Sequence, residues 1–240
     1  MSSERVQGRT LTVLLVLLAT ALVLPSIITW LYFVTFAGHR LMAVIYAIGK
    51  TVQFSLPIIW FVGFARGELN RSLFRAAGTA TGLAFGLAVA VLMILLYRFF
   101  FYKLGLFDAV RAQALERLAA VHLDSPAGYL GVAVFYSLVH SFLEEYYWRW
   151  FVYGQLRKLI PAWPAIVVSS VGFSAHHVIV LMQYFDEPWF VAFCTGGIVI
   201  GGAVWCLIYE KTRSLVGIWL SHLAVDAAIM AIGWDLVFRS

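Results

Sequence analysis

Residues 140–150 read HSFLEEYYWRW, a stretch in which two adjacent carboxylates and an arginine interrupt side chains suited to lipid. An ionised side chain at the centre of a membrane helix costs about 2.5–3.5 kcal/mol, so a membrane protein retains such a group only where it is paired or used. In a helix, Glu145 and Arg149 are i and i+4 with the carboxylate first, an order that favours an ion pair. Glu144 points about 100° away, on the face of His140. The stretch predicts a structural carboxylate beside a chemically available one.

The composition predicts an integral membrane protein. Of 240 residues, 62% are hydrophobic and only 12% are charged, far from the balance of an ordinary soluble domain. The net charge of +5 comes from basic residues scattered in ones and twos between apolar runs, which indicates loop asymmetry. No basic stripe is present, so we expect no nucleic-acid partner and instead expect the lipid bilayer as the surroundings of the chain.

Seven apolar runs are long enough to cross a bilayer core of about 30 Å. They are approximately residues 10–36, 41–64, 74–101, 127–153, 165–182, 189–209 and 215–237. We therefore predict an all-α, polytopic membrane helix bundle of about seven transmembrane helices, with six or eight as the alternatives. Residues 103–124 show apolar side chains at three- and four-residue spacing and predict an interfacial helix. We divide this single integrated membrane domain into N-terminal transmembrane helices with the interfacial helix, 1–125, and a transmembrane core that contains the stretch quoted above, 126–240.

The loops predict the orientation of the chain. On the N-terminal side lie nine basic residues: Arg5, Arg9, Arg66, Arg71, Arg75, Arg157, Lys158, Lys211 and Arg213. On the opposite side lie five: Arg40, Lys103, Arg111, Arg117 and Arg239. The positive-inside rule then places the N-terminus in the cytoplasm. The short, loop-poor layout leads us to expect a bacterial inner (plasma) membrane.

Small residues recur at four-residue intervals in two of the spans. Gly78, Gly82 and Gly86 lie in the third run, and Gly197 and Gly201 lie in the sixth. This spacing lets helix backbones approach closely, so we expect both sets to serve helix packing, with a substrate groove as the lesser alternative.

Two further spans carry polar groups at mid-depth. His176 and His177 lie in the fifth, and His222 and Asp226 lie at i and i+4 in the seventh. Their depths agree with that of Glu144 to within about one or two helical turns, so three helices can present polar groups to one point. The cluster would carry excess negative charge in a low dielectric, which predicts coupled titration of carboxylate and imidazole, as a general base requires.

The ordered set of motifs resembles a known family. The motifs are Glu144-Glu145-x-x-x-Arg149, Phe173-x-x-x-His177 and His222-x-x-x-Asp226. Over residues 141–226 they are similar to the CPBP (CAAX protease and bacteriocin-processing) family of intramembrane glutamate proteases, which includes the prenyl-protein CAAX endopeptidases. The family motif often ends in Asn, whereas this chain has Asp226, so hydrogen-bond donation there depends on protonation.

The resemblance implies an intramembrane endopeptidase. Glu144 and His177 would activate a water that attacks a peptide carbonyl, and His222 and Asp226 would stabilise the oxyanion. Glu145 and Arg149 would support the site or the substrate. The implied partner is a membrane-anchored or lipidated protein or peptide.

Several alternatives stay open. We expect no cofactor, although carboxylate and imidazole ligands suit a divalent metal such as zinc, and the sequence does not discriminate. His140 and His176 have no assigned role. A proton-coupled transporter would also place ionisable groups at mid-membrane, but the chain shows no repeated halves. A non-catalytic, partner-binding member of the same family is the third hypothesis. The substrate could be a prenylated C-terminal peptide, a bacteriocin leader or a sorting-signal tail.

Overall fold

The computed structural model describes residues 2–63, 74–120 and 122–239, and the side chains within them from residue 11 onward. These residues form helices and connecting turns, with no strand among them. Arg5, Arg9, Arg66 and Arg71, which entered the orientation argument, lie outside the side chains so described.

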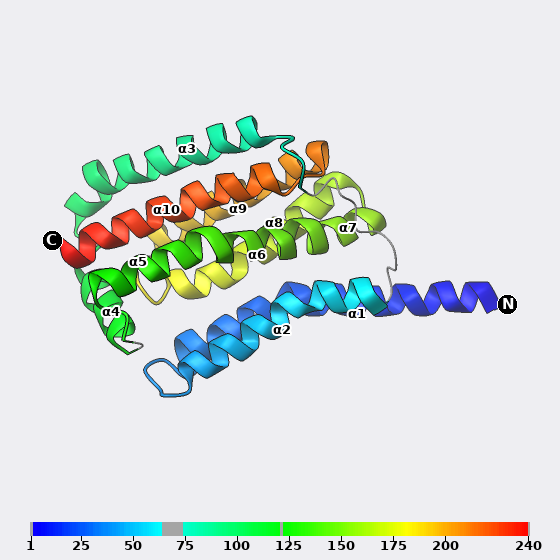
Figure 1. Ribbon diagram of the computed structural model, residues 1–240, viewed down its shortest axis with the longest axis horizontal. Helices are drawn as coiled ribbons and strands as arrows, with labels where there is room; N and C mark the ends of the chain where they lie inside the picture. The colour runs from blue at the N-terminus through cyan, green and yellow to red at the C-terminus, as the bar shows by residue number, and fades with distance from the viewer. Residues whose placement is uncertain (1, 64–73, 121, 240) are drawn as a thin grey trace.

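The predicted all-α, polytopic bundle is confirmed, because seven of the described helices are long and apolar enough to cross a membrane. They are Leu11–Thr35, Met42–Gly63, Thr79–Leu104, Pro126–Leu159, Ala162–Leu181, Pro188–Thr212 and Val216–Phe238. The long helices run along the long axis of the molecule, and the two chain ends lie at opposite ends of the bundle (Figure 1).

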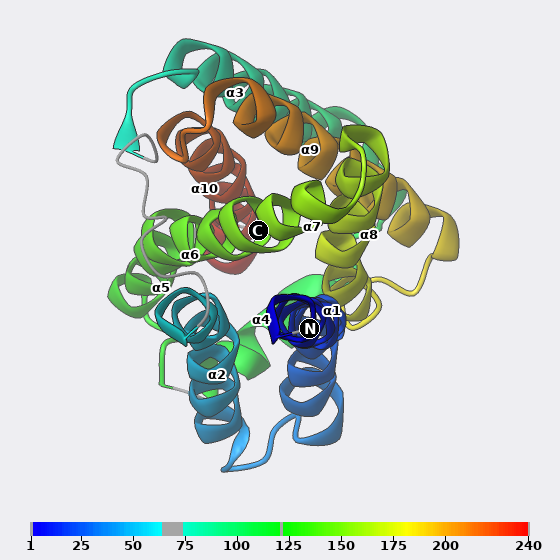
Figure 2. The ribbon, with the colours of Figure 1, turned by 90° about the vertical axis from the view of Figure 1, so that its right-hand side faces the viewer.

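The first two helices form a pair beside the rest of the bundle (Figure 2). Helix α1, Ser2–Trp30, continues through a π-helical segment, Leu31–Thr35, and a short turn leads to α2, Met42–Gly63. The hydroxyl of Tyr147 donates a hydrogen bond of 2.8 Å to the carbonyl of Ala21, which attaches α1 to the fourth span. Helix α1 also packs along α8, so the pair is part of the bundle wall.

The fourth span changes helix type four times. It consists of α5 (Pro126–Val134), a π-helical segment (Phe135–His140), α6 (Ser141–Glu145), a second π-helical segment (Tyr146–Tyr153) and α7 (Gly154–Leu159). The N–H of Ser141 bonds to the carbonyl of Tyr136, five residues back. Glu144 and Glu145 therefore lie on one short α-helical segment between two stretches of wider turns, and π-helical turns occur frequently at functional sites.

The start of this span follows from local sequence. The hydroxyl of Ser125 accepts a hydrogen bond of 3.0 Å from the N–H of Gly128, and Pro126 occupies the first helical position. A serine cap followed by proline satisfies a free backbone N–H and presets the helical φ, so the helix begins there.

The last three spans surround the fourth. They are α8 (Ala162–Leu181), α9 (Pro188–Thr212) and α10 (Val216–Phe238). Large buried side chains from these elements form a single core that includes Trp148, Phe151, Phe173, Trp205 and Ile218. Because aromatic side chains bury much area with few rotatable bonds, this core holds the helices in fixed positions around the polar residues.

Helix α3, Thr79–Leu96, packs on α10 through small residues, as the spacing predicted. A Cβ placed on Gly82 would lie 2.0 Å from the carbonyl oxygen of Gly217, and one on Gly86 would lie 2.6 Å from the Cα of Ser221. The packing prediction is wrong for Gly197 and Gly201, because a Cβ at either position meets no atom within 4 Å. Four-residue spacing shows that backbones can approach, but a neighbouring helix must also be present.

The segment predicted as an interfacial helix contains α4, Asp108–Ala119, along which no residue is buried. Phe107, just before it, packs edge-on against Tyr97 at 5.1 Å and Phe185 at 5.5 Å between ring centroids. The guanidinium of Arg117 lies 4.7 Å from the ring centre of Phe33. These contacts fix α4 at the end of the bundle where the C-terminus lies (Figure 1), and its placement at a lipid surface stays a prediction.

Candidate active site

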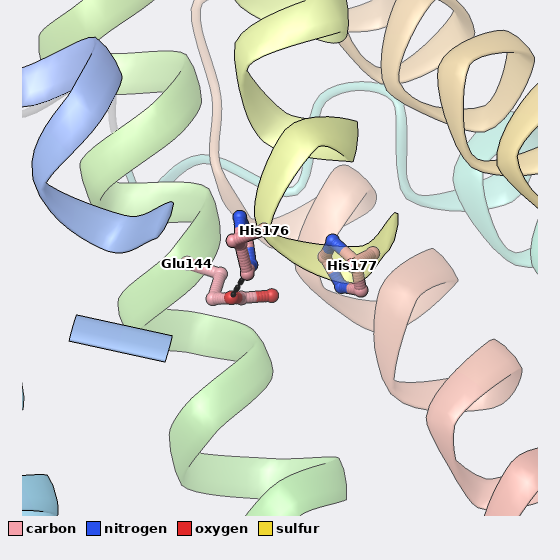
Figure 3. Close-up of side chains that lie close together, drawn as sticks. All are labelled: Glu144, His176 and His177. Carbon is pink, nitrogen blue, oxygen red and sulfur yellow. Dashed lines mark ion pairs between the residues drawn. The ribbon is translucent and has the colours of Figure 1, made fainter. Parts of the chain in front are cut away.

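Glu144 is the centre of the polar cluster. Its side chain extends from α6 towards α8, and the residue is 1% exposed (Figure 3). The Nε2 atom of His176 lies 3.3 Å from Oε1, and that of His140 lies 3.9 Å from the same oxygen. The Nε2 atom of His222 lies 3.8 Å from Oε2. One buried carboxylate thus faces imidazoles from three membrane spans.

His177 is oriented by the backbone of its own helix. Its Nδ1 lies 2.8 Å from the carbonyl oxygen of Phe173, so Nδ1 carries the proton and Nε2 is left as an acceptor. The ring centroids of His177 and His176 are 4.1 Å apart, and Figure 3 shows both rings near Glu144. A neutral imidazole with one nitrogen held and the other available can accept a proton or bind a cation.

Glu145 belongs to a tighter network. Its Oε1 lies 2.7 Å from Nδ1 of His222 and 3.1 Å from Nη1 of Arg149. The Nε2 atom of His222 lies 3.5 Å from Oδ1 of Asp226. The i, i+4 pair expected between Glu145 and Arg149 is present in the structure. Because each nitrogen of His222 faces a carboxylate, the ring can donate to both only as an imidazolium.

Aromatic rings enclose this network. The guanidinium of Arg149 lies 4.4 Å from the ring centre of Phe173 and 4.9 Å from that of Trp205. Trp205 stacks on His222 with centroids 4.4 Å apart, and its indole N–H donates a hydrogen bond of 2.9 Å to Ser221. Cation–π contacts of this kind gain strength when water is excluded, so the rings both bind the cationic groups and exclude water from them.

Trp148 forms another wall of the cluster. Its ring lies almost parallel to that of His176, at 4° and 6.0 Å between centroids. Trp148 and its neighbour Tyr147 are both fully buried. They are packing residues, and Trp148 packs against a candidate site residue.

Lys50 and Gln53 were missed by the sequence reasoning. Both lie on α2, and their exposed fractions are 7% for Lys50 and 0% for Gln53. The Nζ of Lys50 donates a hydrogen bond of 3.3 Å to the side-chain oxygen of Gln53. Lys50 and Glu144 lie close enough to interact electrostatically. The signal was a lysine in the middle of an apolar run, to which the cost argument used for Glu144 applies equally.

With Lys50 included, the charges of the cluster approach balance. Glu144, Glu145 and Asp226 provide three negative charges, while Arg149 and Lys50 provide two positive ones. An imidazolium at His222 brings the total to zero. Neutrality lowers the cost of burying charges in a low dielectric.

The candidate residues taken from the sequence lie together in the structure. Glu144, His222, Asp226, Glu145 and Arg149 are joined by the contacts above, and His177 completes a triangle with Glu144 and His176. The residue whose importance was underrated is His176, which has the shortest distance of any histidine nitrogen to the Glu144 carboxylate.

The same triangle could hold a metal. One ligand atom each from Glu144, His176 and His177 lie within 4.8 Å of one another. Two histidines and a carboxylate form a common zinc ligand set, and the bond from His177 Nδ1 to a backbone carbonyl is the usual outer-shell support of a metal-binding histidine. The residues present therefore fit a divalent cation.

A cavity of about 500 Å³ lies between α2 and the fourth span, on the side of Glu144 where His140 stands. It is lined by Lys50, Thr51, Phe54, Ser55, Ile58, Phe135, His140, Phe142, Leu143 and Tyr146. A second cavity, of about 630 Å³, lies between α3, α5 and α10 and touches none of the cluster residues. The cavity lined by Lys50 and His140 is therefore the one associated with the candidate site.

A buried carboxylate ringed by imidazoles inside membrane helices marks a candidate functional site. Residues 126–228 match the family model for Rce1-like proteins, described as type II CAAX prenyl endopeptidases. Searches of curated proteins and of solved structures found no match. The resemblance drawn from the motifs is confirmed by this match over residues 126–228, and the seven apolar helices make the chain an integral membrane protein.

Proposed function

We propose that the chain is an intramembrane endopeptidase that hydrolyses a peptide bond in a membrane-anchored, lipidated protein, with Glu144 as the general base. The observation that carries the proposal is the surroundings of Glu144: a carboxylate 1% exposed, within 3.3–3.9 Å of nitrogens of His176, His222 and His140. A buried carboxylate of this kind is well placed to take a proton from water held against it.

Hydrolysis then proceeds in two steps. Glu144 takes one proton of the water while the water oxygen forms a bond to the carbonyl carbon of the substrate. His177, through its available Nε2, holds the water for the attack. When the carbon–nitrogen bond breaks, Glu144 returns the proton to the leaving amine, and the other proton of the water stays on the new carboxyl group, so that the products are a carboxylic acid and an amine.

His222 and Asp226 act on the charge that develops on the carbonyl oxygen. The Nε2–H of His222 faces Glu144 and Asp226, so it is a donor directed into the cluster. We propose that it binds the oxyanion while Asp226 holds the ring in place. A donor of this kind contributes roughly 3–4 kcal/mol of transition-state stabilisation in well-studied hydrolases.

Glu145 and Arg149 are supporting residues in this proposal. Their ion pair of 3.1 Å is completely buried, and the Glu145 carboxylate orients His222 through its Nδ1. They act on the reaction through the position of His222.

The test uses purified protein in liposomes with prenylcysteine peptides, and mass spectrometry identifies the bond that is cut. The expected result is cleavage by the wild-type chain and loss of cleavage in Glu144→Gln, a variant that keeps the size of the side chain. Full activity of Glu144→Gln would exclude Glu144 as the base.

A metal-assisted form of the same hydrolysis is the second candidate, favoured by the 4.8 Å grouping of Glu144, His176 and His177. A cation bound there would lower the pKa of a bound water and polarise the substrate carbonyl. In that case His176 and His177 would be ligands, and both would be required equally.

We also propose that the N-terminus faces the cytoplasm of a bacterial cell and that the protein resides in its inner membrane. The excess of basic residues on the N-terminal side supports this orientation. Seven spans place the two ends of the chain on opposite sides of the membrane, so the C-terminus should lie outside the cytoplasm. Reporter fusions at the two ends test this, and an active cytoplasmic reporter at the C-terminus would overturn the orientation.

A further inference from the structure

The buried lysine of α2 interacts with Glu144 at a distance but forms no ion pair in the described part of the chain. Lys50 is 7% exposed, and its ammonium donates to the oxygen of Gln53 at 3.3 Å. No described carboxylate lies within ion-pair distance of its nitrogen. The group lies eight residues into α2, about 12 Å along the helix, within the depth of the hydrocarbon core. A charge at that depth is expensive, which makes it a candidate for a functional role.

Lys50 lines the cavity of about 500 Å³ described above, together with a second donor, Tyr146. The hydroxyl of Tyr146, also on the cavity wall, has no hydrogen-bond partner among the described residues. The amide nitrogen of Gln53 is likewise without one there. On the cavity wall, an ammonium whose one hydrogen bond is to the Gln53 oxygen and a hydroxyl without an acceptor form a site suited to an anion.

The remaining walls of the cavity are apolar. Phe54, Ile58, Phe142 and Leu143 supply most of the surface, and Ile58 at 56% exposed and Phe135 at 42% exposed lie at the lipid-facing side. A volume of 500 Å³ is in the range of small-ligand pockets, which combine apolar walls with a few polar groups that fix orientation. A short apolar peptide segment with one negative charge fits this chemistry.

The depth of Lys50 selects the kind of anion. A lipid phosphate stays at the headgroup level, whereas a carboxylate at the end of an apolar peptide can be carried into the core. A prenylation motif of the C-a-a-X type ends in such a carboxylate, three residues after the modified cysteine. Three extended residues span about 10 Å, so the carboxylate remains near the bond that is cut.

We propose that Lys50, with Tyr146 as a second donor, binds the C-terminal carboxylate of the substrate, so that the enzyme recognises a free chain end. The inference rests on the proposed function and adds the group that selects the substrate. His140 connects the two sites, because it lines the cavity and its Nε2 lies 3.9 Å from Glu144. The leaving fragment would lie in the cavity while its new amine receives the proton from Glu144.

The experiment compares three prenylated peptides of the same sequence: one with a free C-terminal acid, one with a C-terminal amide and one extended by a single residue. Each is assayed with the wild-type chain, Lys50→Met, Tyr146→Phe and Glu144→Gln. Lys211→Met is the matched control, because Lys211 is exposed at the end of α9, away from the cavity. Lys50→Arg is included as a variant that keeps the charge if Lys50→Met fails to fold.

We expect wild-type kcat/KM to be about 10- to 100-fold higher for the acid than for the amide, as for a lost charged hydrogen bond. Lys50→Met removes that preference by lowering activity on the acid alone, Tyr146→Phe reduces the preference, and Lys211→Met and Lys50→Arg retain it. Equal cleavage of acid and amide by an active wild-type chain would overturn the inference and leave the proposed function intact. Absence of cleavage of all three peptides by the wild-type chain would instead overturn the proposed function.

Discussion

Two adjacent glutamates on α6 have different surroundings. Glu145 accepts from His222 at 2.7 Å and from Arg149 at 3.1 Å, and aromatic rings cover both of its partners. Glu144 is equally buried, but its nearest nitrogens lie at 3.3, 3.8 and 3.9 Å, and its Oε1 has no hydrogen bond within the described chain. We call the Glu145 side of the cluster the closed side, because its contacts are short, and the Glu144 side the open side, because its contacts are longer.

The difference in contact distances suits Glu145 to a structural role and Glu144 to proton transfer. A buried charge with short, fixed partners cannot change its protonation cheaply, so it suits a structural role. A buried charge with looser contacts can exchange a proton with a bound water, because fewer bonds must be broken. Adjacent positions on one helix can thus hold an acid for structure and an acid for catalysis.

The largest expected effect tests the open side. Glu144→Gln should lower kcat on a prenylated peptide by about 10²–10⁴-fold, because the proton acceptor is lost. The thermal midpoint should remain within a few degrees of the wild type, since few short bonds are removed. Product formation by mass spectrometry and a thermal-shift assay give the two values, and a large loss of stability with retained activity would reverse the roles assigned to the two glutamates.

The closed side should respond in the opposite way. Arg149→Met leaves Glu145 buried with only one of its two cationic partners, and breaking a buried pair in this way destabilises a protein by about 3–5 kcal/mol. Unfolding in detergent, followed by circular dichroism, measures the change. Arg239→Met, at the C-terminal end beyond the cluster, is the control and should have little effect. A stability equal to that of the wild type would show that the pair is not structural.

A smaller difference is expected between the two neighbouring histidines. His177→Gln should lower kcat by about 10- to 100-fold because the water loses its acceptor, whereas His176→Gln should lower it less, since His176 only contacts the base. Steady-state kinetics on one peptide ranks the two variants. Equal, complete losses in both would favour the metal-assisted mechanism, in which each histidine is a ligand.

The smallest effect is expected from removing metal. Dialysis of the purified protein against a strong chelator should change kcat by less than about twofold if Glu144 and His177 act without a cation. Elemental analysis before and after dialysis provides the control. A complete loss of activity that zinc restores would assign the triangle of Glu144, His176 and His177 to a metal.

Much of the fold could be predicted from the sequence because transfer from water to lipid is a strong local signal. The seven apolar runs agree with the seven observed spans to within about six residues at each end. The pairing of Glu145 with Arg149 followed from helix geometry alone. These features depend only on residues near one another in sequence.

Other features depend on contacts between helices, which the sequence does not display. The histidine nearest Glu144 is His176, because the rotation of α8 is set by packing on Trp148 and on α9. The π-helical segments on either side of α6 carry no motif. Lys50 differs from these features, because the free-energy cost of a lysine in an apolar span can be inferred from the sequence. Only the residues that surround its buried side chain could not be inferred.

The close packing of α3 on α10 affects how variants of this protein will behave. Gly86 touches the backbone of Ser221, the residue before His222, so a methyl group on α3 would displace the helix that carries the proposed oxyanion donor. Substitutions in a helix with no candidate catalytic side chain could therefore tune turnover from a distance. Such positions offer a route to graded, rather than all-or-none, attenuation of the enzyme.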